Sequence, residues 1–456
     1  MNEGGQEWLI THNVQHITLM KLYSTNNKNI TVSFKDAVFN SLPADKGLYM
    51  PQQLPTLSEA FIRDLPSYSL PAMAFEIAHA LIGEAIPAAD LRALIDDAIN
   101  FDAPVVSLDQ RTAVLELFHG PSLAFKDFGA RFMSRVMGYF SEQEHHAKLL
   151  DVLVATSGDT GGAVALGFLG VPGTRVTILY PKGKVSPIQE QQLTRNGQNI
   201  RAIEIDGTFD DCQALVKEAF NDAELNQTLR LTSANSINIA RLIPQTFYYF
   251  HAYAQLARKG VKDVVFAVPS GNFGNIGAGL LAYKMGLPVW QFLAATNVND
   301  TVPRFLSNGR YEPKPSVATL SNAMDVGNPS NWVRIMDLFE NSRDHLNEKI
   351  TAYSYTDEET KQAIDQLYQQ YSYIACPHTA IAYLATEAYR AQHSGNYTTV
   401  FLSTAHPCKF PDVFNETQLA AIQIPEQVKE LAHKTSHKEV LGTEYNAFKH
   451  WLLSYK

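Results

Sequence analysis

Residues 264–279 read VVFAVPSGNFGNIGAG, and this stretch decides the fold. The apolar run 264–268 predicts a strand that is buried on both of its faces, as in a parallel sheet. The loop at 269–279 is rich in glycine and leads into a helix. Backbone N–H groups that no side chain shields can approach a phosphate there, and the helix dipole favours the negative charge. The stretch therefore predicts a strand, a phosphate-binding loop and a helix in succession.

The spacing of these glycines differs from that of the common nucleotide motifs. The loop lacks the Gly-Lys-Ser/Thr ending of a P-loop and the glycine pattern of a dinucleotide site. The next predicted strand ends in Ala-Thr-Asn297, without the acidic residue that would hold a ribose. A turn whose glycines serve packing alone is the simpler alternative, although so many glycines at one junction are costly unless they are used.

The succession of strand, loop and helix repeats from about residue 110 onward. Apolar strand candidates lie at 149–155, 176–180, 200–205, 264–268, 289–294 and 399–403. Because helical patterns follow most of them, we predict an α/β fold of parallel sheets flanked by helices. Ligands of such sheets bind beyond the carboxyl ends of the strands, so the loops at that edge should carry the function.

The chain before this region has a different pattern. Residues 70–100 are predicted to be helical, because Pro87 suits a first turn and apolar residues recur on one face behind it. We therefore predict a helix-rich N-terminal domain over residues 20–110, followed by the α/β region over residues 111–456. Residues 1–19 are interpreted either as a weakly ordered extension or as the result of an upstream start assigned in error.

Composition narrows the class of protein. The chain has 456 residues, of which 45% are hydrophobic and 18% charged, and this is the balance of a folded protein with a large core. A formal charge of −9 without a basic run argues against nucleic-acid binding. The cysteines, Cys212, Cys376 and Cys408, are too far apart to predict a disulfide framework or a metal site. With no secretory signal and no long apolar stretch, we expect a cytoplasmic protein without a membrane partner.

A lysine at a helix start is the second chemical feature. Residues 119–129 read HGPSLAFKDFG and lead into a helix with one apolar face. Lys126 would lie at the N-terminus of this helix, where the dipole and burial disfavour an ammonium ion. A lysine that loses its proton readily can form Schiff bases with carbonyl compounds. The alternative is an exposed lysine followed by Asp127 as an ordinary first-turn acid, since most lysines are solvated.

Two further loops place hydroxyl groups at strand ends. Residues 155–162 read ATSGDTGG and lie beside a predicted helix start that could bind an anion. An ordinary helix cap by Ser157 or Thr160 is the alternative there. Residues 403–407 read STAHP, and Thr404 alone would be unremarkable.

Residues 235–241 read NSINIAR and offer a second candidate for phosphate binding. The Arg241 guanidinium could bind a phosphate together with the Asn235 amide and the Ser236 hydroxyl, unless Arg241 lies on the surface. Two loops suited to phosphate and one lysine at a helix start together indicate a phosphorylated aldehyde cofactor and a phosphorylated substrate.

In these motifs the chain resembles the threonine synthase family, in its longer branch. The likeness runs from about Met20 to the C-terminus and is carried by ELFHGPSLAFKDFG, ATSGDTGGA, SANSINIARL, VPSGNFGNIGAG, AATNVNDTVPRFL and LSTAHPCKF. Several motifs in the correct order make it specific. The resemblance implies fold type II of the pyridoxal 5'-phosphate (PLP) enzymes, similar to the tryptophan synthase β subunit. A small and a large α/β domain within residues 111–456 would hold PLP between them.

The resemblance also implies roles for individual residues. Lys126 would be the catalytic lysine that binds PLP covalently, and Thr404 would face the pyridine nitrogen. Asp159 would lie near the cofactor edge, although Asn often takes its place in the wider fold type. The cofactor phosphate would be held by Gly271, Asn272, Phe273, Gly274 and Asn275. The substrate would be held by Ser157 and Thr160 at its carboxylate and by Asn235, Ser236 and Arg241 at its phosphate.

By the same resemblance, the enzyme would be a carbon–oxygen lyase that converts O-phospho-L-homoserine and water into L-threonine and phosphate. This reaction is the last step of threonine biosynthesis. The nearest alternative is a phospho-lyase with the same fold and cofactor that releases 2-oxobutyrate from the same substrate. A catalytically silent binding protein is disfavoured by the intact Lys126 and phosphate loops. A nicotinamide-dependent dehydrogenase is disfavoured because no acid lies near Asn297.

Overall fold

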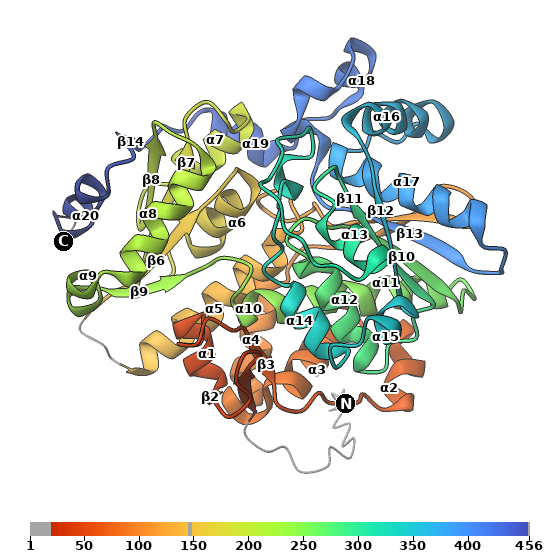
Figure 1. The fold of residues 1–456 in the computed structure, drawn as a ribbon, viewed down its shortest axis with the longest axis horizontal. Coiled ribbons are helices and arrows are strands. Elements are labelled where there is room, and N and C mark those ends of the chain that lie inside the picture. Colours follow the sequence, from red (N-terminus) through yellow and green to blue (C-terminus); the bar gives the residue numbers. More distant parts are fainter. Residues whose placement is uncertain (1–19, 145–147, 455–456) are drawn as a thin grey trace, which may run out of the picture.

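The computed structural model describes residues 20–144 and 148–454, which form two lobes that each contain a parallel sheet (Figure 1). The N-terminal elements lie along the lower side of the molecule in this view. The extension predicted at residues 1–19 lies outside the described residues. The predicted fold class of parallel sheets flanked by helices, with a helix-rich N-terminal region, is confirmed.

The first lobe contains a five-stranded sheet in which every neighbouring pair is parallel. In sheet order its strands are β14 (Lys438–Leu441), β8 (Ile200–Ile205), β7 (Thr174–Pro181), β6 (Leu150–Ala155) and β9 (Arg230–Ser233). Its helices are α6 (Asp159–Phe168), α7 (Pro187–Thr194), α8 (Phe209–Asn221), α9 (Ala223–Thr228) and α20 (Tyr445–Ser454). The central strands β6 to β8 are almost wholly buried, as parallel strands between two helical layers must be.

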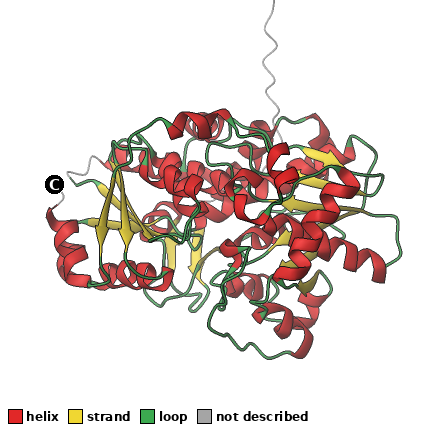
Figure 2. Cartoon of the chain, turned by 90° about the horizontal axis from the view of Figure 1, so that it is seen from above, coloured by secondary structure: helices red, strands yellow, loops and turns green. Residues whose placement is uncertain are grey.

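The second lobe contains a six-stranded sheet that is parallel except for one edge strand. In sheet order its strands are β12 (Ile350–Ser354), β11 (Gln291–Thr296), β10 (Val264–Pro269), β13 (Thr398–Ser403), β5 (Thr112–Glu116) and the antiparallel β4 (Val105–Ser107). Its flanking helices include α11 (Phe247–Ala257), α12 (Gly274–Lys284), α13 (Thr301–Asn308), α16 (Asp357–Tyr371) and α17 (Pro377–Gln392). Seen from above, helices surround both groups of strands (Figure 2).

Every strand predicted from the sequence is present, and β8 has the predicted bounds. β11 begins at Gln291 and not at residue 289, since its register with β10 starts at Gln291, although the Trp290 N–H already donates to the Val264 carbonyl at 2.9 Å. In the two large sheets prediction missed β4, β5, β9, β12 and β14, and it also missed the three strands of the N-terminal region. Of these, β9 and β12 read RLTS and ITAYS, which contain no continuous apolar run.

The N-terminal region combines a small antiparallel sheet with helices. Its strands are β1 (Lys21–Ser24), β2 (Thr31–Ser33) and β3 (Tyr49–Pro51), and its helices are α1 (Phe34–Asn40), α2 (Glu59–Asp64), α3 (Leu70–Ile82) and α4 (Ala88–Ala98). The helix predicted over 70–100 is therefore two helices. Gly83 ends α3 at φ 56°, a conformation that glycine tolerates, and Pro87 is the N-cap of α4 and not part of its first turn.

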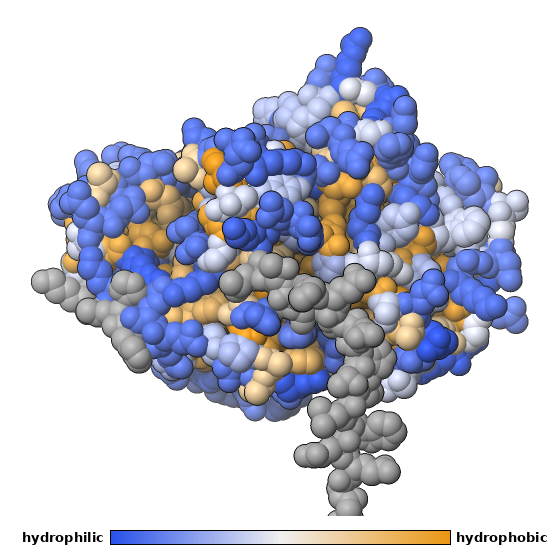
Figure 3. Space-filling view, turned by 90° about the horizontal axis from the view of Figure 1, so that it is seen from below, coloured by the Kyte–Doolittle hydropathy of each residue, from blue (hydrophilic) through white to orange (hydrophobic). Residues whose placement is uncertain are grey.

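One helix connects the three regions. α5 (Lys126–Glu144) buries most of its residues in an apolar cluster that also includes side chains of α3, α11 and both parallel sheets. Its first residue is consequently held between the lobes. Seen from below, the surface is mostly hydrophilic, with smaller apolar areas between the polar ones (Figure 3). None of the helices in the described ranges has both the length and the apolar character that crossing a membrane requires.

A buried arginine ties the N-terminal sheet to the second lobe. Arg334 lies in α14 (Trp332–Leu338) and is only 1% exposed. It donates to the Tyr49 carbonyl of β3 at 3.2 Å and to the Ile237 carbonyl at 2.6 Å. Its Nη1 also donates to Asn331 Oδ1 at 2.7 Å. Arg334 therefore fixes the 235–238 loop relative to both regions.

Replacing this arginine should destabilise the fold. Arg334→Met leaves the Tyr49 and Ile237 carbonyls without their donor, so we expect the free energy of unfolding to fall by roughly 3 kcal/mol. Urea unfolding followed by tryptophan fluorescence measures the change. Arg310→Met at an exposed position is the control and should stay within about 0.5 kcal/mol of the parent. Equal stability of the two variants would contradict the anchoring role.

Candidate active site

The predicted polar residues come from loops at the carboxyl ends of β5, β6, β10 and β13, and the structure brings several of them together. The Phe125 N–H donates to the Thr404 carbonyl at 2.9 Å, and Ala124 forms a bridge with Ala405. These contacts hold Lys126 beside the end of β13. The interpretation of these strand ends as one functional edge therefore agrees with the arrangement.

Lys126 is the first residue of α5, as predicted, and its side chain is half-buried. Burial lowers the pKa of Lys126 to about 8; Asp159 opposes this shift, and the positive charges of Lys409 and Arg241 add to it. A fraction of Lys126 is therefore a neutral amine near neutral pH, the form that attacks an aldehyde.

Asp127 lies in the first turn of α5, but neither it nor Lys126 is exposed, so the alternative of an exposed lysine followed by an ordinary first-turn acid does not hold. Asp127 is fully buried, and its Oδ2 accepts from the Ser122 N–H at 2.9 Å. Burial raises the pKa of Asp127 to about 6. A Cβ on Gly120 would come within 2.4 Å of Asp127 Oδ2, so only glycine lets the chain pass so closely over this carboxyl group.

The glycine loop after β10 presents unpaired backbone donors. Phe273 is the N-cap of α12 with φ 58°, and its side chain makes no capping bond. No residue in the described ranges accepts a hydrogen bond from the backbone N–H groups of residues 271–276. Such a row of donors at the start of a helix suits a phosphate group.

Asn275 adds a side-chain donor to this loop. Its Oδ1 accepts from the hydroxyls of Tyr248 and Tyr249, both at 2.7 Å. Burial raises the pKa of both tyrosines well above the usual value, so they remain donors. This fixes the orientation of the amide, and Asn275 Nδ2 is left buried without a partner among the described residues.

The two predicted phosphate loops lie side by side. Asn272 Nδ2 donates to Ser236 Oγ at 2.6 Å, and Asn272 Oδ1 accepts from the Ser330 N–H at 2.6 Å. Asn331, which the sequence did not single out, donates from Nδ2 to the Asn272 carbonyl at 3.1 Å. The Asn272 side chain thus connects the two loops by hydrogen bonds. Asn235 and Ser236 are half-buried.

Arg241 lies in α10 (Ile239–Leu242) and is 3% exposed, so the alternative of a surface arginine is wrong. Its Nη1 donates to the Ala234 carbonyl at 2.6 Å, and its Nε is buried without a partner among the described residues. It packs over α5, where a Cβ on Gly129 would come within 2.6 Å of Nε. Burial lowers the pKa of Arg241 to about 10, so the side chain keeps its charge at neutral pH.

The start of α6 is capped by a residue that the sequence analysis did not choose. Thr156 Oγ1 accepts from the N–H groups of Gly158 at 3.0 Å and Gly161 at 2.8 Å. The hydroxyls of Ser157 and Thr160 consequently make no hydrogen bond with any described residue. Both remain available to a ligand, as does the adjacent start of the helix.

Asp159 is paired with two residues that sequence reasoning missed. Lys409 Nζ lies 2.6 Å from Asp159 Oδ1, and Gln189 Nε2 donates to the same oxygen at 3.0 Å. Burial alone would raise the pKa of Asp159, but Lys409 and Lys126 hold it well below the usual range. His378 lies near this pair, and burial lowers its pKa to about 4. A lone charge between Cys408 and Phe410 was the available signal for Lys409.

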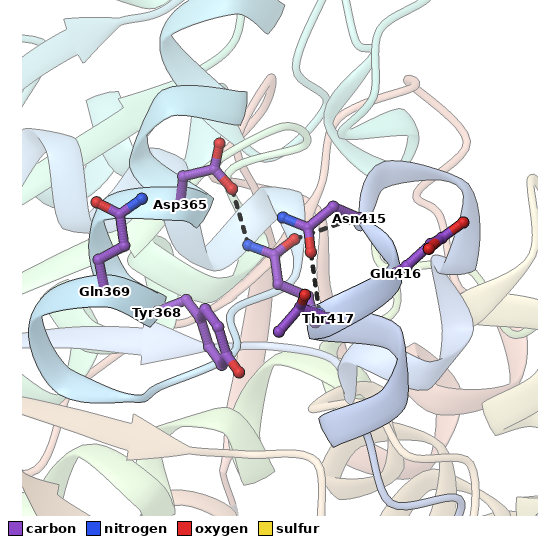
Figure 4. Close-up of a pocket in the computed structure, with 7 residues that line it drawn as sticks. Asp365, Tyr368, Gln369, Asn415, Glu416 and Thr417 are labelled. Atoms are coloured by element: carbon purple, nitrogen blue, oxygen red, sulfur yellow. Dashed lines mark hydrogen bonds between the residues drawn. The ribbon is translucent and has the colours of Figure 1, made fainter.

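An open surface pocket lies elsewhere. It has a volume of about 470 Å³ and lies between α16 and α18 (Glu416–Ala421), where Gln418 Nε2 donates to Asp365 Oδ1 at 2.8 Å (Figure 4). None of the predicted site residues lines it. The candidate active site is therefore defined by the converging loops and not by this pocket.

These residues fit PLP by the chemistry of their donors. Lys126 supplies an amine with a lowered pKa, and the 271–276 backbone with Asn275 Nδ2 supplies unpaired donors for a phosphate. The Thr404 hydroxyl at the end of β13 is neutral and lies beside the lysine segment.

Comparison with known proteins agrees with this assignment. A family model for pyridoxal-phosphate dependent enzymes matches residues 104–405, and models for the threonine synthase N terminus and C-terminal region match 21–99 and 379–451. The threonine synthase of Escherichia coli K12 is 43% identical over 96% of this chain and all of its own length.

Solved structures give the same result. The crystal structure of threonine synthase from Escherichia coli superposes with a TM-score of 0.88 at 44% identity, covering 96% of this chain and 100% of that one. The PLP-bound threonine synthase from Brucella melitensis has a TM-score of 0.87 at 36% identity, covering 95% and 98%. The chain belongs to the threonine synthase family of pyridoxal-phosphate-dependent enzymes.

Proposed function

We propose that this enzyme converts O-phospho-L-homoserine and water into L-threonine and phosphate. The observations that support the proposal are the position of Lys126 at the start of α5 and two sets of donors that lack partners among the described residues. One group is the 271–276 backbone, and the other combines Arg241 with the 235–236 loop. Two phosphates can then be bound at once, one on the cofactor and one on the substrate. The relatives named as threonine synthases support the same activity.

When bound, PLP supplies an electron-withdrawing ring that stabilises negative charge on the carbons of an attached amino acid. The 271–276 N–H groups bind its phosphate, and Asn275 Nδ2 adds a side-chain donor. Thr404 would face the ring nitrogen, and its neutral hydroxyl would not impose a charge on it. The proposed role of Lys126 is to hold the cofactor and then to move protons at the substrate carbons, for which a pKa of about 8 is suited.

The substrate would be held by the remaining donors. Ser157 and Thr160 offer free hydroxyls beside the start of α6, where a carboxylate is favoured by the helix dipole. Arg241 is aimed at the substrate phosphate, with Asn235 and Ser236 at its side. We also propose a cytoplasmic location, which the three free and buried cysteines support.

Product analysis tests the reaction directly. The purified enzyme with PLP is incubated with O-phospho-L-homoserine, and the organic product is identified by chromatography. We expect L-threonine in equal amount with phosphate. Release of 2-oxobutyrate and ammonia in place of threonine would establish the phospho-lyase alternative.

The first variant removes the proposed cofactor lysine. Lys126→Ala should lose the visible absorption band that borohydride abolishes in the parent protein, because no amine is left to bond the aldehyde. Lys217→Ala, at an exposed position, is the control and should keep the band. A Lys126→Ala enzyme with the normal band and normal turnover would show that another lysine binds PLP.

The second variant distorts the glycine loop. A Cβ at position 271 would come within 2.5 Å of the Met324 Cα, so Gly271→Ala must displace the loop backbone. We expect PLP affinity to fall about tenfold or more, since each lost bond to a charged phosphate contributes roughly 1.5 to 3 kcal/mol. Gly277→Ala in α12, which follows the loop, is the control, because its Cβ would meet Ile335 at an ordinary 3.6 Å. Equal PLP affinity in both folded variants would assign the loop to packing.

The third variant separates the two phosphate sites. Arg241→Ala should keep the PLP spectrum but lose about 10- to 150-fold in kcat/KM for O-phospho-L-homoserine. This is the loss expected when a guanidinium group that forms charge-assisted hydrogen bonds to a phosphate is removed. Arg241→Lys should restore only part of the loss, since it supplies charge without the planar fork. Loss of PLP with normal turnover in excess cofactor would mean that Arg241 serves the cofactor site.

A further inference from the structure

The pairing of Lys409 with Asp159 has a consequence for Lys126. Lys409 lies in the turn after β13 and is 0% exposed, so its charge must be compensated within the protein. Besides the contact of 2.6 Å to Asp159, it donates to the Ser122 carbonyl at 3.0 Å. Lys409 thus connects the segment before Lys126, the start of α6 and the end of β13.

The Asp159 carboxylate makes its contacts through only one of its two oxygens in the described structure. Lys409 and Gln189 both approach Oδ1, whereas Oδ2 makes no hydrogen bond with a described residue. The negative charge of Asp159 acts on Lys126 and raises its pKa. A nearby negative charge, if uncompensated, would retain the proton on Lys126 and hinder its function as an amine.

We propose that Lys409 is a positioning residue whose ammonium group neutralises Asp159, so that Lys126 is not held as an ammonium ion. The inference rests on the proposed function only in taking Lys126 as the cofactor lysine. Lys409 acts through Asp159 and touches no reacting atom. The buried pair then carries no net charge beside Lys126, although each member alone would shift its protonation.

The other charged groups near Lys126 do not take the role of Asp159 or of Lys409. Arg241 is positive and acts in the same direction as Lys409. Asp127 on α5 is engaged with the Ser122 N–H, and His378 on α17 is kept neutral by burial. Asp159 is therefore the group that must be neutralised, and Lys409 is the cation in contact with it.

Three variants test the proposal on the full chain prepared without cofactor. Lysines are trace-labelled with acetic anhydride across a pH series, and mass spectrometry reports the peptide containing Lys126 against that of the exposed Lys217. The apparent pKa of Lys126 should be near 8 in the parent. It should rise by roughly one unit in Lys409→Met, fall in Asp159→Asn, and return towards the parent value in the double variant.

Opposite shifts of the Lys126 pKa in the two single variants indicate that Lys409 and Asp159 balance charge. A purely structural role of these two residues would shift this pKa in the same direction in both variants. Lys449→Met is the matched control, since Lys449 pairs with Asp222 at 2.7 Å in a region remote from the site, and it should leave Lys126 unchanged. Shifts of the same sign, or no shift in folded variants, overturn the proposal. If Lys409→Met does not fold, Asp159→Asn and the double variant still decide it. No substrate is used, so failure of the proposed reaction would be seen separately in the product assay.

Discussion

The charges buried around Lys126 must balance, and much of the structure near the site serves this constraint. An isolated buried ion is strongly disfavoured, so each charged side chain there needs a compensating partner or a shifted pKa. Asp159 is compensated by Lys409, whereas Asp127 forms no ion pair with a cation of the described residues and responds with a raised pKa. Lys126 responds with a lowered pKa. The reactivity of one lysine is thus set by residues from three separate segments of the chain.

The second constraint concerns backbone donors that the protein leaves unpaired. Buried N–H groups are normally satisfied, and an unpaired group costs free energy. The described chain provides no acceptor for the N–H groups of residues 271–276, and Asn275 Nδ2 is also unpaired. A bound phosphate can satisfy them together. Cofactor binding should therefore stabilise the folded state as well as enable catalysis.

The sequence predicted the parts of the fold that have strong local patterns. The glycine loop and the helix after Lys126 were located correctly, because apolar runs and glycine clusters signal such junctions directly. The short strands β9 and β12 were missed, because neighbouring strands and not local composition select them. Thr156 was missed as the cap of α6, since Ser157 and Thr160 are equally good caps by residue type.

The site residues also divide into those that a local sequence pattern predicts and those that it does not. Lys126 and the 271–275 loop have motifs, whereas the partners that orient them come from distant segments. Gln189 and Asn331 carry no local signal, and the lone charge of Lys409 between Cys408 and Phe410 does not name its partner, so only the three-dimensional structure reveals their contacts with Asp159 and Asn272.

The N-terminal region takes part in this arrangement, because it supports the loop proposed to hold the substrate phosphate. Asn238 Nδ2 donates to the Val38 carbonyl at 2.7 Å and to Ser41 Oγ at 2.9 Å. Arg334 joins the same loop to β3 from the other side. The loop is therefore fixed directly after Ser236, at Ile237 and Asn238. A preorganised loop loses less entropy on binding, so, if this loop holds the substrate as proposed, the contacts made by the N-terminal region would contribute to substrate affinity without touching the substrate.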